Sequence, residues 1–391
     1  MTTGEDGPGR PRRRRARHTA GPLAVVTLAV VLLVAGCQNL RQPNEPEVWD
    51  DTDLTFAVSD AAGDGAGGVV LVGGSMWERR DASGTGTLET GTFPWLGAVI
   101  AAAPDGRFVV GTTPGGQTSG TQTQSPQIVL VDVGTGTDDV LVGRPGQRPL
   151  PLVPGAPVSP DGTPASDAYL GTVLDVEVMS DGSAVWVEQL WVEFADQDIF
   201  VVRRLAADGT LETLAGRPGD PAAVPVAPSA GAVGRDVVLD GADPRLAAMP
   251  DGGLVVGTRS WTVGVGPDGV LTEVVPGLSA CDAEPTLVES DDEGLLLVRV
   301  GADPAPTRTV DGWVVAEPSD HAQQIVSASQ DASVCSVVAV RAAAAPATAA
   351  EVEVVPDLRG ASGATFLGDD ALVAVYRGSG DQSALLRVSL P

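Results

Sequence analysis

The 391-residue sequence contains no lysine, only two histidines and three cysteines. Without lysine it has no phosphate-binding loop of the Walker type, whose lysine reaches the phosphates. His321 is the one histidine beyond residue 36, so a histidine-rich zinc site is excluded. A Ser-His-Asp triad would need His321 as its base, but no strand-turn nucleophile motif marks a partner. We therefore expect His321 to be a solvent-exposed side chain.

Positive charge is also scarce, with 24 basic against 51 acidic residues and a net charge of −27. Removing residues 1–36, with six arginines and two acids, leaves 18 against 49 and a net charge of −31. Such a surface repels phosphate backbones, so we expect no nucleic-acid partner. Arginine in place of lysine, with abundant Ala, Gly, Val, Asp and Pro, indicates a high-GC and, we infer, actinobacterial genome.

The N-terminus has the three parts of an export signal. A basic stretch up to Arg17 precedes an apolar run from Leu23 to Ala35, which ends at Gly36 and Cys37. A helix needs roughly 20 apolar residues to cross a membrane, so this run predicts a signal peptide and not a permanent span. The general secretory route fits better than twin-arginine export, because Ala16-Arg17-His18 departs from the twin-arginine motif.

The sequence Val34-Ala35-Gly36-Cys37 resembles the lipobox of bacterial lipoproteins. This resemblance implies cleavage before Cys37 and lipidation of its thiol, with several acyl chains as a membrane anchor. An ordinary cleaved signal and a chance buried cysteine are the alternatives. We expect a signal peptide over 1–36, a polar tether over 37–51 and a single domain over 52–391, on the extracytoplasmic side of the cell membrane.

Cys281 and Cys335 are the two remaining thiols. In an oxidising compartment they can form a disulfide, and their spacing is that of about one repeat of the domain. Two separately buried thiols are the alternative.

Short apolar runs separated by turn residues fill the chain from Leu54 onward, and nothing sustains a helical period. This pattern predicts an all-β fold. Asp-Gly pairs suit tight hairpins, in which both central residues take positive φ. Three inner hairpins are expected around Asp105-Gly106, Asp181-Gly182 and Asp251-Gly252, with weaker copies at Glu293-Gly294 and Asp369-Asp370.

A second hairpin follows each strong copy, so each repeat contains four antiparallel strands. These second hairpins are expected over 128–143, 199–216 and 261–275. Four-stranded sheets that repeat every 40 to 75 residues or so are typical of a β-propeller. We expect six blades, with seven as the alternative.

The segment from Val173 to Gly216, which includes DGSAVWV and IFVVRRLAADGTLETLAG, resembles an NHL repeat. The preceding linker, from Val142 to Leu170, resembles the loop that joins blades in bacterial NHL proteins. The similarity covers Phe93 to Gly277 and fades beyond it. The resemblance implies a six-bladed propeller, in a class that includes lyases and lactonases with a metal at the mouth of the central channel.

Candidate ligand sites are weak in this sequence. The densest acidic clusters, Asp291-Asp292-Glu293 and Asp138-Asp139, lack the alternating spacing of a calcium loop, and we expect solvated turns, no metal and no cofactor. The run from Gly264 to Gly269 spells a dinucleotide-binding motif, but it turns into a strand where the motif requires a helix. Seven tryptophans allow carbohydrate stacking, although packing is the expected use of Trp186 and Trp261, which lie within predicted strands. The sequence does not assign the other candidates to strands: Trp77, Trp95, Trp191 and Trp313.

Two function classes remain. The favoured one is a binding or scaffolding module that presents a rigid disc to a protein, peptide or glycan, and we lean against an enzyme. The alternative is an extracytoplasmic lyase or lactonase with a carboxylate-held metal. Convergence of three or more acidic or amide side chains at the channel mouth would favour the alternative. The sequence indicates neither an oligomeric state nor a ligand.

Overall fold

The structure is a computed structural model of the whole chain, which divides into residues 1–43 and 44–391. The residues that it describes all lie in the second unit: 47–50, 54, 56–81, 86–93, 96–113, 126–144, 159–190, 199–217, 228–272, 286–291, 295–300, 313–315, 336–341, 350–355, 361–367, 370–377 and 382–389. Cys37, Cys281, Cys335 and His321 lie outside them. Within the described ranges, no helix has the length and apolarity needed to cross a membrane.

The described residues form β-sheets, and the expected all-β propeller fold is confirmed. The first two sheets contain β2 (Asp60–Gly63), β3 (Val69–Gly73), β4 (Met76–Arg80) and β5 (Thr87–Thr92), then β6 (Leu96–Ala102), β7 (Phe108–Thr113), β8 (Ile128–Asp132) and β9 (Thr137–Val142). The next two contain β10 (Thr172–Val178), β11 (Ala184–Leu190), β12 (Ile199–Leu205), β13 (Leu211–Ala215) and β14 (Leu239–Asp240), then β15 (Arg245–Ala248), β16 (Leu254–Gly257), β17 (Thr262–Val265) and β18 (Leu271–Thr272).

Two further sheets come from the C-terminal part of the chain. One contains β19 (Val288–Ser290), β20 (Leu295–Val300), β21 (Trp313–Val315), β22 (Ser336–Arg341) and β23 (Ala350–Val355). The other joins β24 (Ala361–Leu367), β25 (Asp370–Arg377) and β26 (Gln382–Ser389) to the N-terminal strand β1 (Glu47–Asp50).

The expectation of six or seven blades, each of four antiparallel strands, is wrong. Among the described strands, five sheets are antiparallel throughout and form regular blades. The remaining sheet is mixed, because β20 skips β21 to pair with β22, and β21 pairs in parallel with β23. A blade repeat requires each strand to pair with the next in sequence, and that order is lost between β20 and β23.

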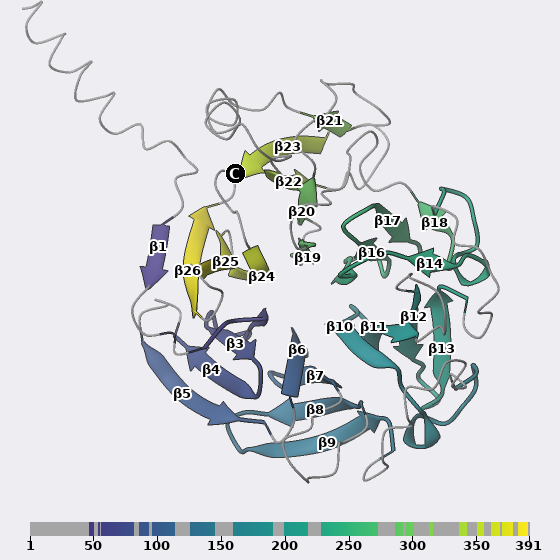
Figure 1. Cartoon of the computed structure of the whole chain (residues 1–391), viewed down its shortest axis with the longest axis horizontal. Coiled ribbons are helices and arrows are strands. Elements are labelled where there is room, and N and C mark those ends of the chain that lie inside the picture. Colours follow the sequence, from purple (N-terminus) through teal and green to yellow (C-terminus); the bar gives the residue numbers. More distant parts are fainter. Residues whose placement is uncertain are drawn as a thin grey trace, which may run out of the picture. The chain divides into compact units, whose positions relative to one another are not determined.

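One edge strand of each sheet lies toward a common centre, and in the last sheet this strand is β24 (Figure 1). β2 contacts β6, β6 contacts β10, β10 contacts β15 and β15 contacts β19. β24 contacts both β19 and β2, and thus closes the circle. We call these six strands the inner strands, and the centre of the circle that they form the channel: β2, β6, β10, β15, β19 and β24.

The inner hairpins form at the predicted Asp-Gly pairs, but with a different turn. In the hairpin between β10 and β11, only Gly182 has positive φ, at 82°. Met179 N donates to Ser183 O, so three residues form the loop. Asp181 Oδ1 accepts the N–H of Ser183 at 2.9 Å, which explains why aspartate precedes the glycine. The same contacts recur at Asp105, Asp208, Asp251 and Asp268.

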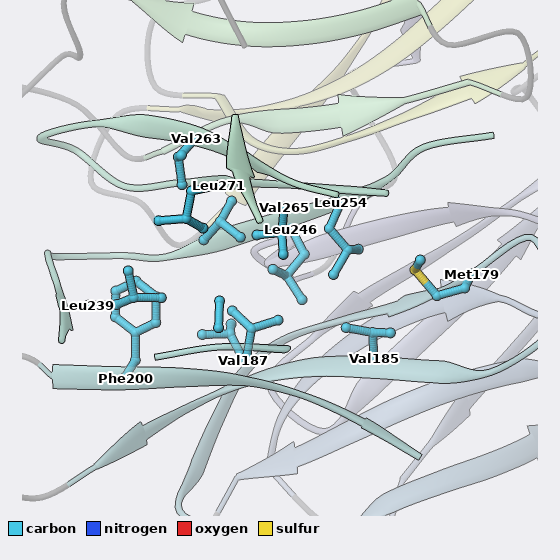
Figure 2. Close-up of a cluster of buried hydrophobic side chains, with 13 residues drawn as sticks. Met179, Val185, Val187, Phe200, Leu239, Leu246, Leu254, Val263, Val265 and Leu271 are labelled. Atoms are coloured by element: carbon cyan, nitrogen blue, oxygen red, sulfur yellow. The ribbon is translucent and has the colours of Figure 1, made fainter. Parts of the chain in front are cut away.

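Neighbouring sheets bury their faces against each other, as stacked blades require. Figure 2 shows one such core, where Phe200 and Val187 face side chains of the next sheet that include Leu246 and Leu271. Phe200 also stacks on the ring of Trp261, with centroids 5.9 Å apart. Full burial of each large apolar side chain stabilises the fold by roughly 1.5 to 3 kcal/mol.

The linkers between blades contain a repeated local structure. Pro164 forms a β-bridge with Thr210, and a short 3₁₀ helix, Ala165–Asp167, follows it. Val233 forms the same bridge with Val270, before the 3₁₀ helix Gly234–Asp236. The linker from Val142 to Leu170 therefore contains one of two copies of this local structure. In each copy, the segment that connects two blades pairs with an outer hairpin.

Strand β1 lies within the segment expected to be a tether. It pairs antiparallel with β26, with Val48 opposite Leu386. The last sheet therefore combines strands from both ends of the domain. Residues 47–50 belong to the propeller, although the sequence places them before its expected start at residue 52.

Candidate functional site in the channel

The inner strands present a set of charged side chains at one end of the channel. Equivalent positions on β2, β10 and β15 are occupied by Asp60, Asp175 and Arg245. Each of the three lies four residues before the residue whose backbone N–H donates the hydrogen bond that closes the inner hairpin. Glu177 on β10 and Glu289 on β19 are also equivalent to each other. In each inner hairpin, the glutamate belongs to the paired residues next to the last pair before the turn. The strands β2, β10 and β19 thus contribute four acids, and β15 contributes an arginine.

The two aspartates link neighbouring sheets through the backbone. Asp60 Oδ1 accepts the N–H of Ala61 at 3.0 Å, and Oδ2 accepts the N–H of Ile100 on β6 at 2.9 Å. Asp175 repeats the pattern with its own neighbour, Val176, and with Leu246 on β15 at 2.7 Å. Both side chains are buried, with 8% and 6% of their residue surface exposed. Their carboxylates are therefore structural links between blades.

Arg245 lies between acids of two different segments. Its Nη1 is 3.7 Å from Asp175 Oδ1, and its Nε is 3.9 Å from Asp243 Oδ1. Its positive charge also lowers the pKa of Asp60 and of Glu289 against the larger effect of burial. Arg245 is therefore a cation shared by Asp60, Asp175 and Glu289.

Burial is the main cause that raises the pKa of all four acids, and their mutual repulsion adds to it for three of them. The pKa of Asp175 is raised to about 7 by burial and by the charge of Asp60, against the lowering effect of Arg245. The charges of Asp175 and Asp60 further raise the pKa of Glu177. The charges of Glu177, Asp60 and Asp175 raise that of Glu289. Burial therefore favours the protonated form of all four acids, and the charges of neighbouring acids favour it further for Asp175, Glu177 and Glu289.

Accessibility separates the two glutamates from the aspartates. Glu177 and Glu289 are partly exposed, whereas Asp60 and Asp175 are buried. Glu177 Oε2 accepts the N–H of Val178 at 3.3 Å, a long contact. The two glutamates therefore keep partial contact with solvent, which the aspartates do not.

The NHL resemblance implies a class of propellers in which lyases and lactonases hold a metal ion. Carboxylates are suitable ligands for a divalent cation. Within the described part of the chain, no three His, Cys, Asp or Glu side chains are placed to hold one metal ion. Both oxygens of Asp60 and Asp175 already accept backbone N–H groups, and Arg245 adds positive charge among them. These residues do not fit a metal held by protein ligands alone.

The tryptophans that the structure describes support packing. Trp186 is fully buried and donates from Nε1 to Glu188 Oε2 at 3.1 Å. Trp261 packs on Phe200 and donates to Asp240 O at 2.8 Å. Trp77 packs beside Phe93, with ring centroids 6.4 Å apart. Trp95, Trp191 and the side chain of Trp313 lie outside the described residues.

The acidic clusters singled out in the sequence are not part of the channel site. Asp138 and Asp139 are exposed on β9, where Asp139 Oδ2 lies 4.0 Å from Arg107. Of the other cluster, Asp291 follows β19, while Asp292 and Glu293 lie outside the described residues. The run from Gly264 to Gly269 forms β17 and a turn before β18, as expected, and provides no helix for a dinucleotide.

A second buried network joins Glu188 to Arg203. Arg203 Nη1 lies 3.5 Å from Glu188 Oε1, and Nη2 donates to Ser159 O at 2.6 Å. Asp161 Oδ1 is 3.3 Å from Nη2 and also accepts from Thr213 Oγ1 at 2.7 Å. Both Glu188 and Arg203 are fully buried. This network ties the linker before β10 to its sheet, and its Glu188 and Arg203 side chains are closed to solvent.

No protein-family model and no curated protein matches this sequence. Solved structures do show similarity. A gluconolactonase from Xanthomonas campestris is 14% identical, with a TM-score of 0.48 over 89% of this chain and 90% of its own. A luciferin-regenerating enzyme is 11% identical, with a TM-score of 0.48 over 88% of this chain and 95% of its own. At these values the similarity carries no argument about activity, which must come from the channel residues.

Sequence analysis missed the channel acids, although a signal for them exists. Asp175 and Glu177 interrupt the apolar strand TVLDVEV, and Glu289 follows the apolar pair Leu287-Val288. An acid within an otherwise buried strand is costly, and so indicates a partner or a function. The sequence does not indicate which strands lie next to one another around the channel.

Proposed function

We propose that this chain is an extracytoplasmic hydrolase that opens a small carboxylic ester, such as a lactone, in its channel. The observation that carries the proposal is the convergence of Asp60, Asp175, Glu177 and Glu289 with Arg245 on neighbouring inner strands. This convergence favours an enzyme over a binding module. Titratable groups with raised pKa values in a channel are typical of acid-base sites.

Glu177 and Glu289 are the proposed acid-base pair, because both are partly exposed and the negative charge of ionised Glu177 raises the pKa of Glu289, which favours its protonated form. Ionised Glu177 takes a proton from a water molecule, whose oxygen bonds to the ester carbonyl carbon. The carbon–oxygen bond to the leaving alcohol then breaks, and Glu289 donates its proton to that oxygen. The products are a carboxylic acid and an alcohol, joined in one hydroxy acid when the substrate is a lactone. Transfer of a proton from Glu177 to Glu289 restores the pair.

Arg245 supplies the positive charge for this step. Its charge acts on Glu289, and it belongs to the same end of the channel. A cation near a carbonyl stabilises the negative charge that develops on the carbonyl oxygen during attack. Asp60 and Asp175 are positioning residues, because their oxygens hold the inner strands together.

Lactone turnover by purified protein tests the proposal. Proton release from γ-butyrolactone and related lactones is followed at constant pH for the wild type, Glu177→Gln and Glu289→Gln. We expect each variant to lose about 100-fold or more in rate, since one acid-base group typically contributes that much. Asp138→Asn changes an exposed acid on β9 and is expected to leave the rate unchanged. Lactones bound but released intact would instead support the binding module.

The anchor forms a separate part of the proposal. We propose that Cys37 carries lipid after cleavage and holds the domain on the outer side of the cell membrane. The lipobox sequence and its place at the end of the apolar run support this. Cys37→Ala is expected to release the protein into the medium or to leave its signal uncut. Normal cleavage with unchanged membrane retention would contradict lipidation.

A further inference from the structure

Two arginines flank one aspartate beside the channel acids. Arg245 Nε lies 3.9 Å from Asp243 Oδ1, and Arg259 Nε lies 3.9 Å from Asp243 Oδ2. Both separations are those of ion pairs and exceed hydrogen-bond length. The two guanidinium groups therefore share one carboxylate at ion-pair distance. Arg245 also lies 3.7 Å from Asp175 Oδ1, whereas Asp243 is the one acid paired with Arg259 among the described residues.

The backbone at Asp243 is unusual. Asp243 has a φ of 56°, the one positive value outside glycine among the described residues. Aspartate tolerates this region, but at a cost, and such positions concentrate at functional sites. The conformation accompanies a link to the next segment, because Asp243 Oδ2 accepts the N–H of Thr286 at 2.8 Å. It thereby holds Thr286 beside the arginine pair.

Two buried polar atoms at this place have no hydrogen-bond partner within the described part of the chain. They are the hydroxyl of Thr286 and Nε of Arg259. Thr286 is buried, with 6% of its surface exposed, whereas the Arg259 side chain is 37% exposed. A buried polar atom without a partner is costly, and a ligand that accepts its hydrogen bond removes that cost.

We propose that Arg245, Arg259 and Thr286 form a subsite for the carboxylate of a small hydroxy acid. A carboxylate suits this set, because planar guanidinium groups donate paired hydrogen bonds to its two oxygens. The hydroxyl of Thr286 donates a further hydrogen bond. The inference rests on the proposed function, since ester opening converts the carbonyl beside Arg245 into this carboxylate.

Binding of a product to the full mature chain tests the subsite without turnover. The probe is 4-hydroxybutyrate, measured by titration calorimetry, with the neutral 4-hydroxybutanamide as the matched control. We expect the wild type to bind the acid and not the amide. Arg259→Gln is expected to weaken binding by about tenfold or more, the usual effect of losing a hydrogen bond to a charged group. Equal binding of acid and amide would overturn the subsite.

Thr286→Val provides a second variant that preserves shape. Because the hydroxyl has no partner within the described residues, its removal is expected to leave the unfolding midpoint of the free protein unchanged or raised. The same variant is expected to weaken binding of 4-hydroxybutyrate. Unchanged affinity in both Thr286→Val and Arg259→Gln contradicts the proposal, and so does equally tight binding of inorganic phosphate.

The two proposals fail in different ways. Lactone hydrolysis by a wild type that does not bind 4-hydroxybutyrate overturns the subsite and leaves the hydrolase standing. Arginine-dependent binding of 4-hydroxybutyrate without hydrolysis of any lactone overturns the hydrolase and leaves a carboxylate-binding propeller.

Discussion

Asp60 and Asp175 lie at equivalent positions of two blades, and each accepts a backbone N–H from the inner strand of the next sheet, at Ile100 and at Leu246. The same carboxylates raise the pKa of Glu177 and Glu289 through their negative charge. The groups that join the blades therefore also set the protonation of the proposed acid-base pair. Stability and activity are coupled at the centre of this propeller.

Asp175→Ala removes both acceptors at one of these links. The buried N–H groups of Val176 and Leu246 lose their partners. We expect the free energy of unfolding to fall by roughly 1 to 3 kcal/mol for each N–H left unsatisfied. Urea unfolding measures the loss, and Asp138→Ala on the exposed face of β9 is the control. Equal stability of the two variants would show that Asp175 is not a structural link.

The pH dependence of stability follows from the same residue. Its pKa is raised from 3.8 to about 7 in the folded chain. The folded state thus binds the proton more tightly than the unfolded state. This contribution to stability is complete below about pH 4 and is lost as the pH rises through about 7. The raised pKa values of Asp60, Glu177 and Glu289 act in the same direction, while Arg245 keeps its charge throughout.

We therefore expect the free energy of unfolding to decrease between about pH 5 and about pH 8. Asp175→Asn resembles the protonated acid and cannot ionise, so its stability should change less over this interval. Parallel urea titrations of the two proteins compare the slopes. Identical slopes would mean that Asp175 does not titrate in this range.

The buried pair of Glu188 and Arg203 predicts a large effect from loss of one partner. Burial raises the pKa of Glu188, and Arg203 and the indole of Trp186 oppose this. Arg203→Met leaves the carboxylate without its cation, and we expect a loss of roughly 3 to 5 kcal/mol. Arg107→Met removes the partner of Asp105 in an exposed pair, and we expect it to change stability far less, because water and salt screen such pairs.

Thermal unfolding compares the two arginine variants directly. Adding Glu188→Gln to Arg203→Met removes the unpaired charge and should recover part of the stability. A double variant less stable than Arg203→Met alone would contradict the view that the unpaired carboxylate causes the loss.

The hairpins could be predicted from sequence because their signal is local. Gly106, Gly182 and Gly252 take positive φ at the predicted turns, and each preceding aspartate accepts the N–H two residues beyond it. Sequence reasoning placed positive φ at both turn residues, but the three-residue loop needs it only at glycine. The outcome was a correct strand order from β6 to β18, with a different turn.

The blade count and the channel site depend on contacts that no local pattern encodes. β20 pairs with β22 rather than β21, and the Asp311-Gly312 pair before β21 gives no sign of this. Asp60 and Glu289 are more than two hundred residues apart in sequence, yet the charge of Asp60 acts on Glu289. Only closure of the inner strands brings such residues together.

Pairing of β1 with β26 predicts that the start of the domain lies before residue 52. A chain beginning at residue 52 lacks β1 and leaves an edge of β26 unpaired, and unpaired edges promote aggregation. A chain beginning at residue 44 keeps β1 and is the matched control. We expect the shorter chain to have a lower unfolding midpoint and to scatter more light on standing at the same concentration. Equal midpoints and equal scattering would show that β1 adds nothing to the last sheet, and that residues 47–50 act only as part of the tether.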